Sequence, residues 1–231
     1  MVSESTVWKK NRRKLNSYEF NEDWELMITL FNNRIENKFF TPIDLMLDKG
    51  NKDGIGFSIV AIQCLLIELF ATFRIGKIHN PRYNKENDPK YQFKDSAEIY
   101  VGFLNSCFIF ENYFHRVENS IIKENEPIDA FDFYANVRCG LLHEGKTKKN
   151  WTINLKPRNE KEKGFIKLSN GKIKIYRTIL QKELRNYFKS YLKELRSNDK
   201  KNELLRRNFA RKMDNLYGFK PNKKEFNWWC E

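Results

Sequence analysis

The chain has few of the residues from which metal sites and disulfide frameworks are built. Its 231 residues include three histidines and four cysteines, Cys64, Cys107, Cys139 and Cys230. The cysteines are far apart and form no C-x-x-C pair, so we expect no metal site, and nothing in the sequence implies a cofactor. The first three lie in apolar helical surroundings and are expected to be buried thiols, which indicates a reducing compartment.

Several other features are also absent. The first 16 residues are polar and basic without an apolar core, unlike a secretion signal, and no apolar run reaches the roughly 20 residues that span a bilayer. We therefore expect a cytoplasmic protein that does not contact a membrane. The sequence also lacks a glycine-rich phosphate loop, a His-x-Glu zinc arrangement and paired carboxylates on strands, which argues against several common enzyme classes.

What the chain does have is apolar residues and positive charge. Apolar residues make up 40% and aromatic residues 15%, enough to fill a core. The net charge of +13 is uneven. Residues 1–144 carry 18 Lys and Arg against 21 Asp and Glu, a net charge of −3, whereas residues 145–231 carry 25 against 9, a net charge of +16. This asymmetry favours a polyanionic partner, of which nucleic acid is the commonest.

Apolar spacing predicts a mainly α-helical fold, a helical bundle with a small β-hairpin insertion and basic C-terminal helices. After a basic tail at 1–17, we expect helices at 22–37, 41–47 (with Thr41 as its cap), 55–78, 95–104 and 106–122, a motif helix at 131–145, a strand at 151–155, a hairpin at 165–176, and helices at 177–196 and 202–216. A long loop is expected at 79–94, and the tail at 226–229 is expected to dock on the body. The expected domains are 18–150 and 151–231, packed as one unit.

The central apolar helix contains two charged residues, Glu68 and Arg74. A buried ion must be paired or face a polar cleft. We interpret them either as a structural pair or as residues that support a site, and the structural pair is the favoured alternative.

The motif helix carries Arg138 and His143 on either side of Gly140. Asp129 or Asp132 can cap its start and Gly145 suits a left-handed stop. Five residues correspond to roughly 7.5 Å of rise and about 140° of rotation, so both side chains can border one groove. Glycine costs about 1 kcal/mol inside a helix, which suggests that a phosphate backbone or the same helix of a second subunit approaches there. A histidine near a helix end can also serve only the helix dipole.

Residues 133–151 resemble the segment around the Arg-x4-His motif of the HEPN superfamily. The resemblance is carried by Phe133-Tyr134-x-x-Val137, by Arg138-Cys-Gly-Leu-Leu-His143-Glu-Gly145 and by the following Lys146-Thr-x-x-x-Trp151. The resemblance covers about residues 55–150 as architecture and 131–151 as motif. It implies an all-helical domain that acts as a homodimer, with an antitoxin or another defence-system protein as a partner. It also implies a metal-independent endoribonuclease of bacterial antiphage defence or of a toxin system.

In this interpretation Arg138 and His143 are the catalytic residues. The imidazole exchanges protons with the RNA 2′-hydroxyl and the leaving oxygen, and the guanidinium stabilises the phosphate, which gives 2′,3′-cyclic phosphate and 5′-hydroxyl ends. Supporting roles are assigned to Glu68, Cys139, Gly140 and Glu144. RNA-binding roles are assigned to basic residues that follow the motif: Lys146, Lys148, Lys149, Lys167, Lys172, Lys174, Arg206, Arg207 and Arg211.

Two departures from the family pattern are visible. Cys139 stands where the family commonly has Asn, Asp or His, and Gly145 stands where a subset has a Tyr that a nucleotidyltransferase partner modifies. Cys139 and His143 could be a nucleophile and its base, but a Cys within an apolar helix is usually inert. The first alternative function is a non-catalytic HEPN-type protein that binds RNA or a partner. The second is a structural interaction module, whose nucleic-acid affinity would not fall between 50 and 200 mM salt.

Overall fold

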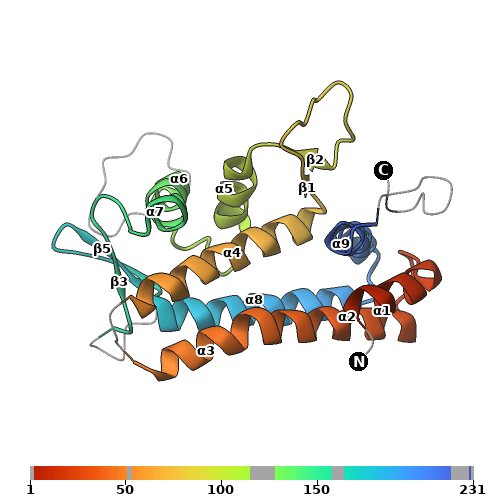
Figure 1. The fold of residues 1–231 in the computed structure, drawn as a ribbon, viewed down its shortest axis with the longest axis horizontal. Helices are drawn as coiled ribbons and strands as arrows, with labels where there is room; N and C mark the ends of the chain where they lie inside the picture. Colours follow the sequence, from red (N-terminus) through yellow and green to blue (C-terminus); the bar gives the residue numbers. More distant parts are fainter. Residues whose placement is uncertain (1–2, 51–53, 115–127, 158–163, 220–228, 230–231) are drawn as a thin grey trace. The chain divides into compact units, whose positions relative to one another are not determined.

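The computed structural model describes residues 3–50, 54–114, 128–157, 164–219 and 229. Helices dominate the described residues, and strands are few and short, which confirms the expectation of a mainly α-helical protein (Figure 1). The chain divides into two compact units, each made of separate stretches. Unit 1 comprises Met1–Glu36, Leu69–Ser96 and Phe188–Glu231, and unit 2 comprises Asn37–Glu68 and Ala97–Tyr187. The expected domain ranges, 18–150 and 151–231, stay a prediction.

All four chain crossings between the units fall inside helical segments. These segments are the π-helical turn η2 (Glu36–Phe40) and the helices α4 (Ile55–Ile75), α5 (Ser96–Ser106) and α8 (Arg177–Arg196). The units therefore have no connecting linker at these points.

Unit 1 further contains α1 (Glu4–Asn11), η1 (Arg12–Lys14), α2 (Glu22–Ile35), β1 (Ile78–His79), β2 (Gln92–Phe93), η4 (Lys200–Asn202) and α9 (Glu203–Leu216). Its core is aromatic. The ring of Phe31 lies 4.5 Å from that of Phe73 and 5.3 Å from that of Phe209, and Phe188 packs on Phe31 from α8. These rings come from three separate stretches of the chain, so the core forms only when all three assemble.

In the segment expected as a basic tail, residues 1–17, the described residues 3–17 are an ordered part of unit 1. Ser3 caps α1 by accepting a hydrogen bond from the backbone N–H of Thr6. Trp8 is fully buried and its Nε1 donates to Asp214 at 2.8 Å, while Arg12 forms a buried ion pair with the same carboxylate. The expectation of a tail was wrong because one buried indole and one buried ion pair anchor a segment whose average composition is polar.

Trp229, the described residue of the tail expected at 226–229, docks on unit 1 as expected. Its side chain is fully buried, its Nε1 donates to Asp214 at 3.0 Å, and its carbonyl accepts from Arg211 Nε at 2.7 Å. Residues 220–228 lie outside the described residues. Trp8 and Trp229 therefore bind the same buried carboxylate.

The connection from α2 to α3 (Thr41–Asp48) differs from the expected break at Thr41. Helical residues run without interruption from Glu22 through η2 to Asp48. Thr41 is the first residue of α3 rather than its cap, and Phe40, in the cap position, is itself helical. Pro42, which has no backbone N–H to donate, is the second residue of α3 and follows directly after the π-helical turn η2.

The central helix α4 ends at Ile75, earlier than expected. Gly76 takes a left-handed φ of 64°, which ends the helix, and a Cβ there would lie 2.8 Å from the backbone of Asn208. Ile78 and His79 then pair with Gln92 and Phe93 in a short parallel bridge, within and next to the expected loop.

Unit 2 further contains α6 (Ala130–Phe133), the π-helical η3 (Tyr134–Arg138), α7 (Cys139–Glu144) and the strands β3 (Trp151–Asn154), β4 (Ile166–Ser169) and β5 (Lys172–Tyr176). The expected hairpin is present: β4 and β5 are antiparallel, and Asn170 and Gly171 both have positive φ, as a type I′ turn requires. The strand expected after the motif, β3, pairs with β5 in parallel.

The helix expected at 106–122 is not formed in its described part. Residues 107–114 form successive turns, with Phe110 N–H bonded to Cys107 O and Tyr113 N–H to Phe110 O. The rings of Phe110 and Phe114 are buried against other aromatic rings, among them Phe165. The packing of these rings stabilises the turns more than the helical spacing of the apolar residues favours a helix. Residues 115–127 lie outside the described residues.

Candidate functional site

The motif helix forms as expected but contains a π-helical segment. Asp129 caps it through the backbone N–H of Phe131, and Gly145 ends it with a φ of 67°. Between α6 and α7, the five residues of η3 have the wider π spacing, which often occurs at functional sites. Arg138 is the last residue of that segment, so the local widening directly precedes Cys139.

Arg138 is largely buried and is held in an ion pair. Its side chain is 14% exposed, and its Nη2 donates to Glu68 Oε2 at 2.6 Å. Its guanidinium lies 5.5 Å from the ring centre of Tyr134, while its Nε is buried and has no hydrogen-bond partner among the described residues. Desolvation lowers the pKa of Arg138, but the hydrogen bond and charge of Glu68 more than offset it, so the pKa is raised.

Glu68 was expected either to pair with Arg74 or to support the site. The structure places it against Arg138, whereas Arg74 pairs with Glu194 at 2.7 Å in unit 1. The interpretation of Glu68 and Arg74 as one pair was therefore wrong. They lie six positions apart in α4, about 600° of rotation, so they project from different sides of the helix.

His143 is exposed in the last turn of α7. It lies five residues beyond the buried Arg138. One of the two expected catalytic side chains is thus fixed by an ion pair and the other is open to solvent. An imidazole near a helix C-terminus is also favoured by the helix dipole when protonated.

The space around Gly140 is filled by the chain itself. A Cβ on Gly140 would lie 2.6 Å from the carbonyl oxygen of Lys146, and the N–H of Lys146 donates back to Gly140 O at 3.3 Å. The close approach that the sequence suggested is real. Its partner is the loop that follows Gly145, and neither a phosphate nor a second subunit is needed to explain the glycine.

Two thiols lie near the Arg138 pair. Cys64 is fully buried, and its pKa is raised to about 12, mainly by desolvation. Tyr100 is also fully buried, lies beside Cys64 and has a pKa well above its ordinary value for the same main reason. Cys139 is half-buried, with its Sγ 3.9 Å from Arg138 Nη1. Cys64 and Cys107 are buried thiols as expected, and Cys139 is more accessible than expected.

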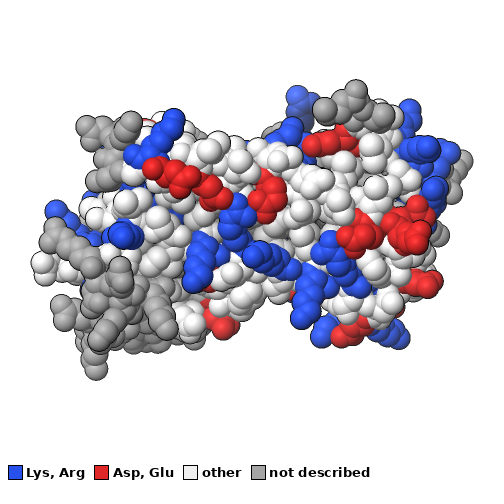
Figure 2. All heavy atoms as spheres, turned by 90° about the horizontal axis from the view of Figure 1, so that it is seen from below, with Lys and Arg blue, Asp and Glu red and all other residues white. Residues whose placement is uncertain are grey.

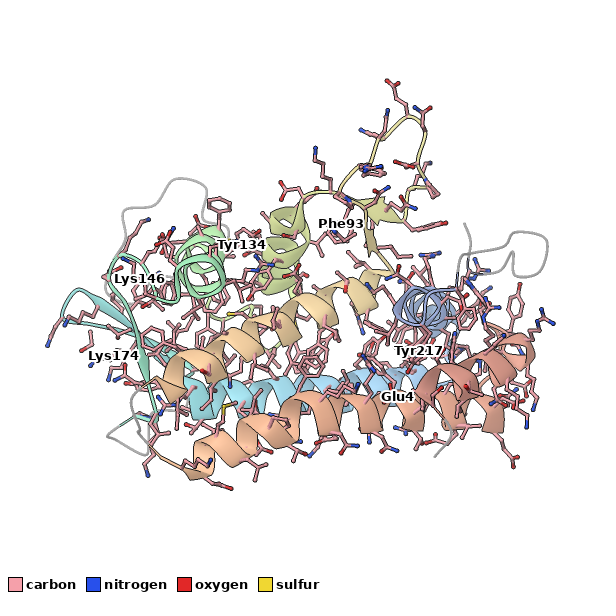
Figure 3. All side chains as sticks on the ribbon, viewed as in Figure 1. Glu4, Phe93, Tyr134, Lys146, Lys174 and Tyr217 are labelled. Carbon is pink, nitrogen blue, oxygen red and sulfur yellow. The ribbon has the colours of Figure 1, made fainter. Side chains whose placement is uncertain are left out.

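Three of the lysines that follow the motif lie in the loop between Gly145 and β3. Lys148 pairs with Glu144 at 2.6 Å, and this pairing lowers the pKa of Glu144. Lys149 is exposed and pairs with Asp132, and Lys146 lies in the same loop. Figure 3 shows Lys146 and Lys174 at the same end of unit 2, and Tyr134 on the side of the motif helix that faces α5. The lysines expected on β4 and β5 alternate with apolar residues as expected, and of these Ile166, Ile173 and Ile175 are buried while Leu168 is half-buried.

Two of the arginines assigned to RNA binding are structural, which is a correction. Arg206 is fully buried and donates to the carbonyls of Ser17 and Ser197 at 2.8 and 2.6 Å. Arg211 is buried and holds the carbonyl of Trp229, with its guanidinium over the ring of Tyr91. Because these guanidinium groups serve the interior of unit 1, they do not present a surface to phosphate.

Arg207 is half-buried, with its Nε 3.5 Å from Ser17 Oγ. Elsewhere the basic residues are partly compensated. Arg185 pairs with Asp44 in unit 2 and Arg196 with Glu25 in unit 1. On the face drawn in Figure 2, acidic side chains lie among the basic ones.

Asp132 has a role beyond that of a helix cap, which is the only role that its place in the sequence suggested. Its carboxylate accepts hydrogen bonds at 2.7 Å from each of three donors, Asn136 Nδ2, Lys149 Nζ and Trp151 Nε1. It therefore fastens the first residue of β3 to the motif helix. A signal was available, because a buried Trp needs a hydrogen-bond acceptor and Asp132 is an acid within the motif stretch.

No three His, Cys, Asp or Glu side chains in the described ranges are grouped as ligands for a metal ion. Within the same ranges one helix, α4, is long and apolar enough to cross a membrane, which the sequence patterns did not predict. The core helix of a water-soluble protein passes the same test, and 56% of the relevant window is buried within the chain. The expected cytoplasmic location stays a prediction.

The described residues define a mainly helical protein in which one helix presents a buried, paired arginine and an exposed histidine. Comparisons of the chain with models of protein families, with curated proteins and with solved structures find no match. The HEPN assignment therefore depends on the motif and on the site geometry, and it is carried forward as a proposal.

Proposed function

We propose that the chain is a HEPN-type endoribonuclease that cleaves RNA without a metal ion. The observation that carries the proposal is the combination, on one helix, of an exposed His143 with an Arg138 whose guanidinium is fixed by Glu68 at the end of the π-helical segment. An exposed imidazole can reach a substrate, and a fixed guanidinium is oriented before substrate arrives.

His143 takes the proton from the 2′-hydroxyl of RNA or gives one to the leaving 5′-oxygen. Imidazole is the side chain that enzymes most often use for both kinds of proton transfer. Arg138 stabilises the negative charge that grows on the phosphate as the 2′-oxygen attacks. The products are a 2′,3′-cyclic phosphate and a 5′-hydroxyl, and DNA is not cut because it lacks the attacking hydroxyl.

The proposal includes a homodimer in which two copies of the motif helix share one cleft. It also includes a biological role in antiphage defence or a toxin system, in which an antitoxin or another defence protein is the partner. Both follow from the HEPN resemblance. The dimer has a direct measurement, the mass of the purified protein in solution by light scattering.

The test is digestion of a labelled single-stranded RNA in EDTA, with mapping of the product ends. We expect the wild type to cut and His143→Ala to be inactive while its circular dichroism spectrum is unchanged. His79→Ala is the matched control, since His79 is another exposed histidine, on β1. Equal cleavage by His143→Ala and by the wild type would falsify the proposed role of the imidazole.

A second candidate is a non-catalytic protein of the same type that binds RNA or a partner protein. The observation in its favour is that Glu68 already neutralises Arg138, whose side chain is mostly buried. Under this alternative Arg138 and His143 hold a nucleotide or the dimer, and the wild type leaves the length of the RNA unchanged in EDTA.

A further inference from the structure

The outward face of the sheet in unit 2 is polar and basic. In the register of the three strands, Lys174 on β5 lies between Thr152 on β3 and Lys167 on β4, and Lys172 lies opposite Ser169. The alternate positions are apolar, and most of them are buried. Side chains of a strand alternate between the two faces, so the lysines and hydroxyls share one face.

This face places like charges side by side. Lys167 and Lys174 are direct cross-strand partners, and like charges in such positions repel each other. Lys172 lies two residues from Lys174 on the same strand and the same face, so three lysines are grouped where one polyanion could contact them together.

The sheet is attached to the helix that carries Arg138 and His143. Asp132 on that helix binds the indole of Trp151, the first residue of β3, and Asn150 donates to the carbonyl of Gly171 in the hairpin turn. The N–H of Lys148 also donates to Asn136 O at 2.9 Å. The basic face is therefore fixed to the candidate catalytic helix by hydrogen bonds on both sides of the connecting loop.

We propose that the outward face of the β3–β5–β4 sheet binds the phosphate backbone of single-stranded RNA. Lysines two residues apart on a strand have Cα atoms about 6.6 Å apart, so several phosphates can be contacted together. The hydroxyls of Thr152 and Ser169 add neutral donors. The aromatic side chain at the end of β5 on this face, Tyr176, is buried, so the described strands present no exposed apolar anchor for insertion into a membrane. The inference rests on the proposed function only in naming RNA as the substrate.

The experiment measures binding of a fluorescein-labelled single-stranded RNA by anisotropy in EDTA at 50, 100 and 200 mM KCl. All proteins carry His143→Ala so that cleavage does not interfere. The test variant is Lys172→Ala with Lys174→Ala. The control is Lys189→Ala with Lys193→Ala, which removes the same charge from exposed lysines on α8.

The test variant should bind about tenfold more weakly at 100 mM salt, with the slope of log affinity against log salt smaller by about 1.4, whereas the control should stay within about twofold. DNA of the same sequence should bind within a few fold of RNA, because the contacts are to phosphate. Equal loss in the test and control variants would mean a non-specific charge effect and would overturn the proposal, as would absence of RNA binding by the parent.

The two proposals fail separately. If RNA binding depends on Lys172 and Lys174 but the protein that retains His143 does not cleave RNA, the proposal of an RNA-binding sheet is retained and the proposal of a nuclease is rejected. If the protein cleaves RNA in EDTA but the two lysine substitutions leave its RNA affinity unchanged, the nuclease proposal is retained and the RNA-binding sheet is rejected.

Discussion

Arg138 and His143 show how differently two residues of one motif can be placed. The guanidinium of Arg138 is mostly buried and needs a counter-charge, which Glu68 supplies from α4, whereas the imidazole of His143 is exposed. Removing one partner of a buried pair leaves an uncompensated charge, so the pair should matter to stability as well as to function.

Glu68→Ala should lower the free energy of unfolding by about 1–3 kcal/mol, a value reduced from that of a fully buried pair because both side chains are partly exposed. Glu194→Ala is the matched control, since the Arg74–Glu194 pair is more exposed, and it should cost less than about 1 kcal/mol. Urea denaturation followed by circular dichroism gives both values. An equal effect of the two substitutions would contradict the assignment of Glu68.

Cys64 makes stability depend on alkaline pH. The folded-state pKa is raised from the ordinary value of 9.0 to about 12, so the unfolded chain loses this proton first as pH rises. The stabilising contribution is complete below pH 9 and is lost between pH 9 and about 12, by at most about 4 kcal/mol.

The measurement is urea denaturation at pH 8.0 and 10.5, for the wild type and for Cys64→Ala. The wild type should lose more stability between these two pH values than Cys64→Ala does. Both proteins share the titration of Tyr100, whose raised pKa acts in the same direction. Identical losses would show that the thiol is not buried as described.

At the scale of elements, the motif helix and the loop after it form one packed piece. The backbone of Gly140 meets the carbonyl of Lys146, so the helix ends with its following loop folded back on it. The glycine is thus a packing requirement of this segment.

Gly140→Ala should destabilise the protein by about 1–3 kcal/mol, because a new methyl group would overlap a backbone carbonyl that cannot rotate away. Gly102→Ala is the control. Gly102 lies in α5, and nothing lies within 4 Å of the place that its new methyl group would take, so alanine there should stabilise by up to about 1 kcal/mol. Thermal unfolding of both variants checks the opposite signs.

Sequence patterns predicted the elements whose period is regular, and they failed where packing decides. The lysine alternation and the Asn170–Gly171 turn correctly predicted the hairpin, since strand faces and turn chemistry are local. The turns at 107–114 were not predictable, because buried aromatic rings are compatible with a helix or with turns. Glu68 was named as a supporting residue of the site, but its pairing with Arg138 was not identified, because the two residues lie seventy positions apart in the chain.

At the scale of unit 1, two distant segments meet at one carboxylate. Asp214 is fully buried and accepts from Trp8, from Arg12 and from Trp229. Sequence patterns did not predict that these segments share one buried carboxylate. Residues 1–17 are basic on average, and that average gives no indication that the indole of Trp8 anchors them. The position of a chain segment was here decided by three side chains rather than by its average polarity.

Asp214→Ala should lower the free energy of unfolding by about 3–5 kcal/mol, since it leaves the buried Arg12 without its counter-charge. Asp199→Ala removes a carboxylate from the exposed pair with Lys201 and should change stability far less, as is usual for exposed ion pairs. Guanidinium titration of both variants gives the comparison. Asp214→Asn, which retains the shape and one acceptor, should fall between them.

The helical crossings between the two units have a practical meaning for expression of parts of the protein. A gene fragment cut at any single point yields a polypeptide with incomplete shares of one unit or of both, since the three stretches of unit 1 alternate along the chain with the two stretches of unit 2. Neither unit can be produced as one uninterrupted fragment, and a circular rearrangement of the gene would not make either one continuous, because residues 69–96 would still separate the two stretches of unit 2. Co-expression of the separate stretches of one unit is therefore the route by which either half could be obtained by itself.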